Sequence, residues 1–303
     1  MRSLLLPTLL ALLSCDRTEP DSGEGEVDTS ETPESPLSSE SHWVAVDAGG
    51  EHTCGLDEDG HVACWGRDDQ GQADAPQGVF VRVSAGAYHS CAIRDDRTVA
   101  CWGWDAFGQA SPPAGRFVAV HAGGHHTCAL DEAGGMTCWG SDETGQIGEP
   151  TGTWSQVSAA FCHTCALRPD ATLECWGWNE YGQARPPEGS WLQVSGGSYD
   201  HTCGVLLDGR ATCWGWDLYG QSSPPSETFT EISAGWRHTC GLMGNGIVRC
   251  WGWNGDGQST PPESTYTHVS SGDHHTCGLR PDGRIQCWGC AGEAASYGQC
   301  TPP

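Results

Sequence analysis

A pair of cysteines ten residues apart recurs seven times in this chain and limits its fold more than any other feature. The first cysteine of each pair stands in the setting His-(Thr/Ser)-Cys and the second in the setting Cys-Trp-Gly. The first cysteines follow one another every 37 residues, once 38. Such a period is typical of propellers, solenoids and arrays, whose units bury their apolar faces against neighbours. The pairs are Cys54 with Cys64, Cys91 with Cys101, Cys128 with Cys138, Cys165 with Cys175, Cys203 with Cys213, Cys240 with Cys250 and Cys277 with Cys287.

Each repeat unit contains three segments that read as short strands. The first opens on an aromatic residue with an aliphatic residue three positions later, as Trp43 and Val46 do. A glycine-containing bend leads to the His-Thr-Cys segment, and a third segment ends at Cys-Trp-Gly. We therefore predict an all-β chain with seven units of about three short antiparallel strands.

The turn between the second and third segments predicts a disulfide inside each unit. If Cys54 faces Cys64 across a hairpin, the inner pair is Asp57 with His61, and the loop between them ends at Gly60. A three-residue loop needs a left-handed residue at this position, which glycine adopts without strain. The cysteines then occupy a non-hydrogen-bonded pair, where antiparallel strands come closest. Each bridge should stabilise the fold by about 2–3 kcal/mol.

Besides Cys15 near the N-terminus, three further cysteines lie outside these pairs. Cys290 and Cys300 also stand ten apart and close an insertion, so an eighth bridge is predicted. Cys162 is then odd, and it predicts a free thiol or a covalent dimer through an intermolecular bond. A zinc site formed by two Cys-x-x-Cys pairs, which would use Cys165 and Cys287, is the weaker alternative because both have hairpin partners.

The N-terminus predicts export. A short apolar run, Leu4 to Leu13, follows a basic residue and is too short to span a bilayer permanently. Its end resembles a bacterial lipoprotein processing site, which implies that residues 1–14 are a signal peptide and that Cys15 is lipidated. An ordinary signal peptide cleaved nearby is the alternative. Residues 15–42 are acidic and contain no Phe, Trp or Tyr, so we predict a disordered tether before the repeats at 43–303.

The charge balance excludes some partners. The chain has 39 acidic and 14 basic residues, a formal charge of −25. Phosphate backbones are bound through Lys and Arg, so nucleic-acid binding is not expected. A protein partner would be basic or be recognised through aromatic contacts. The sequence shows no Ser-His-Asp setting and no phosphate-cradling loop, and we predict neither an enzyme nor a cofactor.

Several segments identify a family. Val83 to Ser90, then Cys101-Trp102-Gly103-Trp104, and then Gly108-Gln109 with Pro112-Pro113 resemble repeats of the regulator of chromosome condensation family. The compact period is most similar to that family's bacterial β-lactamase inhibitor type. The resemblance covers residues 43–303 and implies a seven-bladed β-propeller with three-stranded blades. For function it implies only that aromatic residues before each repeat histidine lie on the face that grips a partner.

Histidine, tryptophan and the Gly-Gln pair recur in every unit, and recurrence favours a structural role. A ring of seven imidazoles is also a conceivable metal site. A residue present in every blade is more simply a blade-building residue, so we predict no metal. The repeat histidines are His52, His89, His126, His163, His201, His238 and His275, and the tryptophans predicted between blades are Trp65, Trp102, Trp139, Trp176, Trp214, Trp251 and Trp288.

Residues that vary while the repeat stays constant are the candidates for binding. They stand just before each repeat histidine or in the loop after Trp-Gly, and aromatic clusters at one end of a rigid scaffold concentrate binding energy. The predicted function is a non-catalytic protein-binding module anchored in the bacterial cell envelope, facing the periplasm or the surface. An inhibitor of a secreted or periplasmic enzyme is the alternative, and glycan binding is the third. The candidates are Tyr88, Trp104, Phe107, His125, Phe161, Tyr181, Tyr199, Asp200, Tyr219, Trp236, Arg237 and His274.

Overall fold

The computed structural model describes residues 42–148, 150–291 and 297–303 of the chain. The predicted signal peptide 1–14, the lipidation site Cys15 and the tether up to residue 41 lie outside the described residues. No helix in the described ranges is long and apolar enough to cross a membrane.

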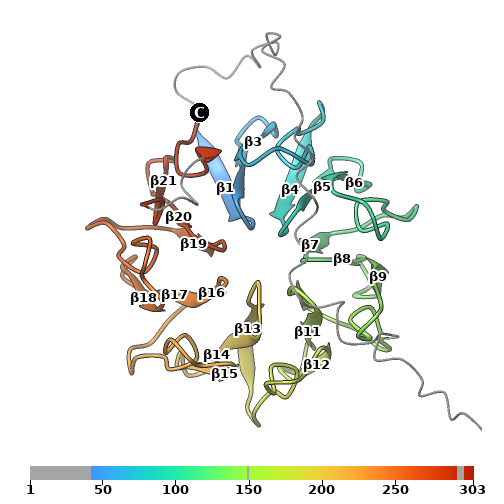
Figure 1. The fold of residues 1–303 in the computed structure, drawn as a ribbon. Coiled ribbons are helices and arrows are strands. Elements are labelled where there is room, and N and C mark those ends of the chain that lie inside the picture. Colours follow the sequence, from blue (N-terminus) through green and yellow to red (C-terminus); the bar gives the residue numbers. More distant parts are fainter. Residues whose placement is uncertain (1–41, 149, 292–296) are drawn as a thin grey trace, which may run out of the picture.

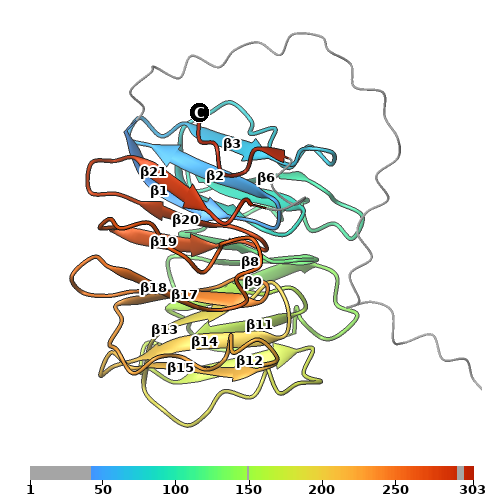
Figure 2. The same ribbon diagram turned by 60° about the vertical axis from the view of Figure 1, so that its left-hand side comes forward.

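The described residues form seven three-stranded antiparallel sheets, arranged as blades around a central axis (Figure 1). The first strand of each blade lies nearest the axis and the third lies at the rim; Figure 2 shows the blades from the side. This confirms the predicted fold. The strands are β1(Trp43–Ala48), β2(His52–Asp57) and β3(Val62–Gly66) in blade 1; β4(Phe80–Ala85), β5(His89–Arg94) and β6(Val99–Gly103) in blade 2; β7(Ala119–Ala122), β8(His126–Leu130) and β9(Met136–Gly140) in blade 3; β10(Gln156–Ala159), β11(His163–Leu167) and β12(Leu173–Gly177) in blade 4; β13(Trp191–Gly196), β14(His201–Leu206) and β15(Ala211–Gly215) in blade 5; β16(Glu231–Ala234), β17(His238–Leu242) and β18(Val248–Gly252) in blade 6; and β19(His268–Ser271), β20(Thr276–Leu279) and β21(Ile285–Trp288) in blade 7.

The hairpin turns have the predicted geometry. Cys54 lies directly opposite Cys64, with Cα atoms 4.1 Å apart, as the close-approach pair requires. Gly60 has a φ of 85°, the left-handed conformation. In two units an ordinary residue replaces this glycine, and the sequence predicts strained or different turns there. Arg97 and Ala171 adopt φ values of 74° and 67°, so the same turn forms at a cost of about 1–2 kcal/mol each.

The predicted cysteine pairing is confirmed for all seven hairpins and for the eighth bridge. The first cysteine of every hairpin is fully buried, whereas the second is only partly buried, because the third strand lies at the rim. The disulfides join Cys54 to Cys64, Cys91 to Cys101, Cys128 to Cys138, Cys165 to Cys175, Cys203 to Cys213, Cys240 to Cys250, Cys277 to Cys287 and Cys290 to Cys300.

Two alternatives for the cysteines are wrong. Cys165 and Cys287 are held in their hairpin disulfides, which rules out the zinc site. None of the cysteines that the structure describes is free, so the prediction of a free thiol at Cys162 is wrong. Cys162 is 3% exposed.

Apolar side chains from two neighbouring blades fill each seam. Between blades 1 and 2, Cys54 and Leu56 pack against Phe80 and Trp102. The tryptophan of Cys-Trp-Gly therefore lies in the seam, as predicted, and the aromatic residue that opens each unit joins it there. Burying one such side chain is worth roughly 1.5–3 kcal/mol, and no blade can bury it alone.

The repeat histidine joins each blade to the next by a hydrogen bond. Ser90 Oγ donates to the Gln72 carbonyl at 3.0 Å, so it accepts from His52 Nε2–H at 2.7 Å. This assigns the Nε2–H form of a neutral imidazole. The same Gln72 carbonyl accepts a second bond from Trp102 Nε1 at 2.9 Å. The repeated His, Thr or Ser, Trp and Gln thus form one inter-blade unit, which we call the belt.

The belt also closes the ring between the last blade and the first. His275 Nε2 lies 2.8 Å from Thr53 Oγ1, although the two residues are 222 positions apart. The Gln299 carbonyl accepts bonds from Thr53 Oγ1 at 3.2 Å and Trp65 Nε1 at 2.9 Å. The same hydrogen bonds that join the other blades therefore also join blade 7 to blade 1.

In six of the seven blades a glycine in the loop after the first strand allows neighbouring loops to approach around the axis, and in blade 4 Ala160 takes this place. A Cβ on Gly123 would clash with the Ala160 carbonyl oxygen. We expect Gly123→Ala to lower the free energy of unfolding by about 1–3 kcal/mol, because backbone on both sides has to shift. Guanidinium unfolding measures this. Gly244→Ala is the matched control, since its Cβ meets only Thr230 at 3.8 Å; equal losses for both variants would contradict the packing argument.

A candidate protein-binding face

The loops that carry the candidate residues lie at one end of the propeller. The first and third strands of a blade run in the same direction, so the loops that follow them emerge side by side. Backbone bonds join the two loops: Trp104 N–H donates to the Tyr88 carbonyl at 2.9 Å, and Trp216 N–H to the Asp200 carbonyl at 2.7 Å. We call the end formed by these loops in blades 2 to 7 the aromatic face.

One cluster of rings spans blades 2 to 4. Trp104 contacts Tyr88, Phe107 and His125 with ring centroids 5.7, 5.3 and 5.4 Å apart. His125 continues to Phe161 at 4.8 Å. These edge and tilted contacts are the favoured geometry for aromatic pairs. The structure therefore joins five of the predicted residues into one packed group.

A second cluster spans blades 4 to 7 around Trp216. Its ring contacts Tyr181, Tyr199 and Tyr219 at 6.3, 5.8 and 5.6 Å. Trp216 stands in the loop after Trp-Gly, one of the two places where the sequence locates the candidates for binding. The remaining contacts of this cluster are Tyr199–Trp236, Trp236–Trp253, Trp236–His274 and Trp253–His274.

The predicted residues differ in the exposed fraction of their side chains and form a buried layer and a more exposed layer above it. Tyr88, His125, Phe161 and Asp200 are buried. Five are half-buried: Trp104, Tyr199, Trp236, Arg237 and His274. The residues most open to a partner are Tyr181 at 50% exposed, and Phe107 and Tyr219 at 39% each.

Two acidic groups on this face are paired within it. Asp200 accepts a bond from Gln183 Nε2 at 2.8 Å, and burial, with repulsion from Glu180, raises its pKa to about 6. His274 Nδ1 lies 2.9 Å from Asp256 Oδ2 in a neighbouring loop. The face therefore combines wide aromatic area with isolated, desolvated polar groups, which is typical of interface cores.

In blade 1, charged side chains take the place that aromatic side chains have in most other blades. Arg67 stands where blades 2, 4, 5 and 6 have a tryptophan, and its Nη atoms lie 2.6 Å from Glu51 and 2.7 Å from Asp69. The guanidinium is also 5.6 Å from the Tyr297 ring centroid. Its donors are satisfied within the chain.

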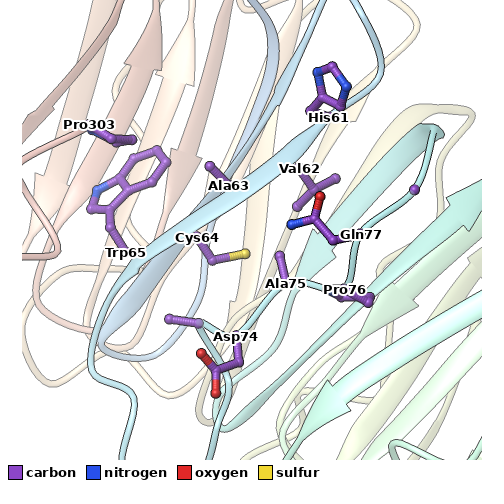
Figure 3. Close-up of a pocket in the computed structure, with 12 residues that line it drawn as sticks. His61, Val62, Ala63, Cys64, Trp65, Asp74, Ala75, Pro76, Gln77 and Pro303 are labelled. Carbon is purple, nitrogen blue, oxygen red and sulfur yellow. The ribbon is translucent and has the colours of Figure 1, made fainter. Parts of the chain in front are cut away.

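Two grooves lie away from the aromatic face, at the rim. One, of about 380 Å³, lies between β3, the connection 73–78 and Pro303. Figure 3 shows Val62 to Trp65 with Pro76 and Gln77 on one side and Pro303 on the other. A second, of about 460 Å³, has the equivalent walls 247–249 and 261–265 in blade 6. Because the two grooves lie at equivalent seams, we attribute them to the geometry of the blades. No cluster of titratable groups lines either groove.

The repeat sequence and the propeller together decide the family. The family model described as "Regulator of chromosome condensation (RCC1) repeat" matches seven segments, one per blade. The chain belongs to the RCC1 repeat family. The matched segments are 43–72, 80–109, 117–146, 154–183, 191–221, 229–258 and 266–299.

Solved RCC1-like propellers are similar in fold. The ectodomain of the Physcomitrella patens receptor kinase CR4 is 28% identical with a TM-score of 0.68, over 80% of this chain and 72% of that one. The ectodomain of the Arabidopsis thaliana receptor kinase ACR4 is 25% identical with a TM-score of 0.68, over 82% and 97%. Prp20p from Saccharomyces cerevisiae, a structure titled for its binding to Gsp1p and histones, is 19% identical with a TM-score of 0.63, over 76% and 80%, and supports the fold alone. No curated protein sequence matches this chain.

The disulfides and the ectodomain relatives together indicate an extracellular or secreted protein. An RCC1-type propeller on this framework is consistent with a protein-interaction module.

Proposed function

We propose that this chain is a non-catalytic propeller that binds a protein outside the cytoplasm through its aromatic face. The observation that carries the proposal is the presence of two clusters of packed rings in blades 2 to 7, which leave Phe107, Tyr181 and Tyr219 exposed above buried residues. Tyrosine, tryptophan and arginine concentrate binding energy at interfaces, and a rigid scaffold loses little entropy when it binds.

We place the propeller in the bacterial cell envelope, held by a lipid on Cys15 and a tether through residue 42. The support is the sequence Leu12-Leu13-Ser14-Cys15 and the acidic, aromatic-free stretch that follows. In this arrangement the protein contacts the membrane only through its lipid. A covalent dimer through Cys162 would require this cysteine to leave the disulfide in which the structure holds it, and a non-reducing gel of the purified protein tests this prediction.

The double variant Tyr181→Ala with Tyr219→Ala tests the face. We expect binding to a partner captured from the envelope fraction to weaken at least ~10-fold, because two exposed rings at the centre of the contact are lost. The measurement is the dissociation constant of the purified pair, with circular dichroism to show that folding is intact. Leu207→Ala is the control: this side chain is 62% exposed and lies at the β14–β15 turn, at the opposite end of blade 5. Equal binding by all three proteins would remove the face from the proposal.

Inhibition of a secreted or periplasmic enzyme is the second candidate, favoured by the resemblance of the compact repeats to the β-lactamase inhibitor type. It requires that a captured enzyme lose activity in proportion to occupancy. Glycan binding is the third candidate, because aromatic surfaces also stack on sugar rings. It requires binding to purified glycan in the absence of any protein, with loss in the same double variant.

A further inference from the structure

Arg237 on the aromatic face is held flat by three rings. Its guanidinium carbon lies 3.7 Å from the Trp236 ring centroid, 5.3 Å from that of Tyr219 and 5.8 Å from that of Trp216. Stacking of this kind fixes the plane of the guanidinium and leaves its edges to bond with other groups. The side chain is therefore positioned before any partner arrives.

The hydrogen-bonding capacity of Arg237 is largely unused within the chain. Among the described residues, its one side-chain hydrogen bond runs from Nη1 to the Tyr219 hydroxyl at 3.4 Å, and no carboxylate lies within 4.0 Å of the guanidinium. Its Nε is buried without an acceptor. A guanidinium has five N–H donors, and a partly desolvated cation without a counter-charge is costly.

Arg67 shows how the same residue type is satisfied elsewhere on this end of the propeller. It binds carboxylates of Glu51 and Asp69 through both Nη atoms and also lies over a tyrosine ring. The chain carries 39 acidic residues, yet no described one is placed at Arg237. The contrast indicates that the counter-charge of Arg237 comes from outside.

We infer that Arg237 is an anchor that receives a carboxylate of the partner protein, an Asp, a Glu or a C-terminus, between Tyr219 and Trp236. This rests on the proposed function and names the chemistry of its contact. A carboxylate matches the planar fork of the guanidinium bidentately. A single negative charge also suits a chain of formal charge −25, which repels polyanions such as nucleic acid.

A displayed library of random dodecapeptides, panned on the wild-type propeller, tests this inference. We expect recovered peptides that need Tyr181 and Tyr219 to share an acidic residue beside an apolar one. Their affinity should fall at least ~10-fold with Arg237→Gln, since the charge-assisted hydrogen bonds to the peptide carboxylate are lost. Arg237→Lys should give an intermediate loss, because a point charge replaces the fork. Arg116→Gln, remote from the ring clusters, is the control.

A double-mutant cycle isolates the contact. Replacing the peptide's acidic residue by its amide should cost ~10-fold against the wild type and almost nothing against Arg237→Gln. Peptides that need Tyr181 and Tyr219 but bind Arg237→Gln unchanged would overturn the anchor and leave the aromatic face in place. If no recovered peptide needs those two tyrosines, the aromatic face and the anchor both fall.

Discussion

Mild acid should unfold this protein. The belt buries a neutral imidazole in every blade, and burial is the main cause that lowers the pKa of His52, His89, His163, His238 and His275 to about 3. The pKa of His201 is lowered to about 4. In the unfolded chain these groups titrate near 6.5.

The direction follows from proton binding. Below pH 6.5 the unfolded chain binds more protons than the folded one, so the stability that the neutral rings provide is complete above pH 6.5. It declines as the pH falls toward 3. At pH 5 each ring accounts for a loss of about 2 kcal/mol, and six rings together for about 12 kcal/mol, comparable to the whole stability of a typical domain.

The free energy of unfolding, measured in urea between pH 7.5 and 4.5, checks this. Near pH 5 we expect a slope of roughly 8 kcal/mol per pH unit from the six rings. His238→Gln, which keeps a donor toward Thr276, should reduce the slope by about 1.4 kcal/mol per unit. Leu207→Ala at an exposed turn, which removes no titratable group, should not change it. A stability that is flat from pH 7 to pH 4.5 would show that the belt imidazoles are not neutral and buried.

Reduction of the disulfides should have an effect of similar size. Each hairpin bridge closes a loop of about eleven residues and contributes about 2–3 kcal/mol in the chain-entropy model, so the eight bridges between described cysteines contribute about 16–24 kcal/mol. That exceeds the stability of a typical domain. The fully reduced and alkylated chain is therefore expected to lose its near-ultraviolet circular dichroism at pH 7.5, where the belt is intact.

Removal of one bridge separates this effect from nonspecific damage. Cys203→Ala with Cys213→Ala should keep the fold and lower the free energy of unfolding by about 2–3 kcal/mol, because the hairpin register is still held by its ladder and turn. Alkylation without reductant is the control for the reagent, and it should leave the spectrum unchanged. A reduced chain that stays folded would mean that seam packing and the belt alone are sufficient.

Local features of the chain could be predicted well. The spacing of Cys54 and Cys64, the glycine at position 60 and the strand pattern act over ten residues, so register, turn and disulfide follow from one another. Because the pattern repeats, the prediction made for one hairpin applied to all seven blades. The candidate loops were located for the same reason, because they are the places where the repeat varies.

Long-range contacts could not be predicted from such patterns. Nothing in the sequence near His275 indicates that its partner is Thr53, or that the Gln299 carbonyl closes the ring. The burial of Tyr88 and Phe161 beneath the exposed rings also depends on loops from other blades.

The sequence by itself determined the blade, its disulfide and the number of repeats, because these depend on turn geometry and on a period that can be counted. Only the tertiary structure decided which repeated groups join neighbouring blades and which of two similar arginines has carboxylate partners within the chain. Arg67 meets carboxylates from its own blade, whereas Arg237 meets only rings. The physical reason is that hydrogen bonds, burial and charge pairing depend on distances in space, and closing the ring brings together residues more than 200 positions apart.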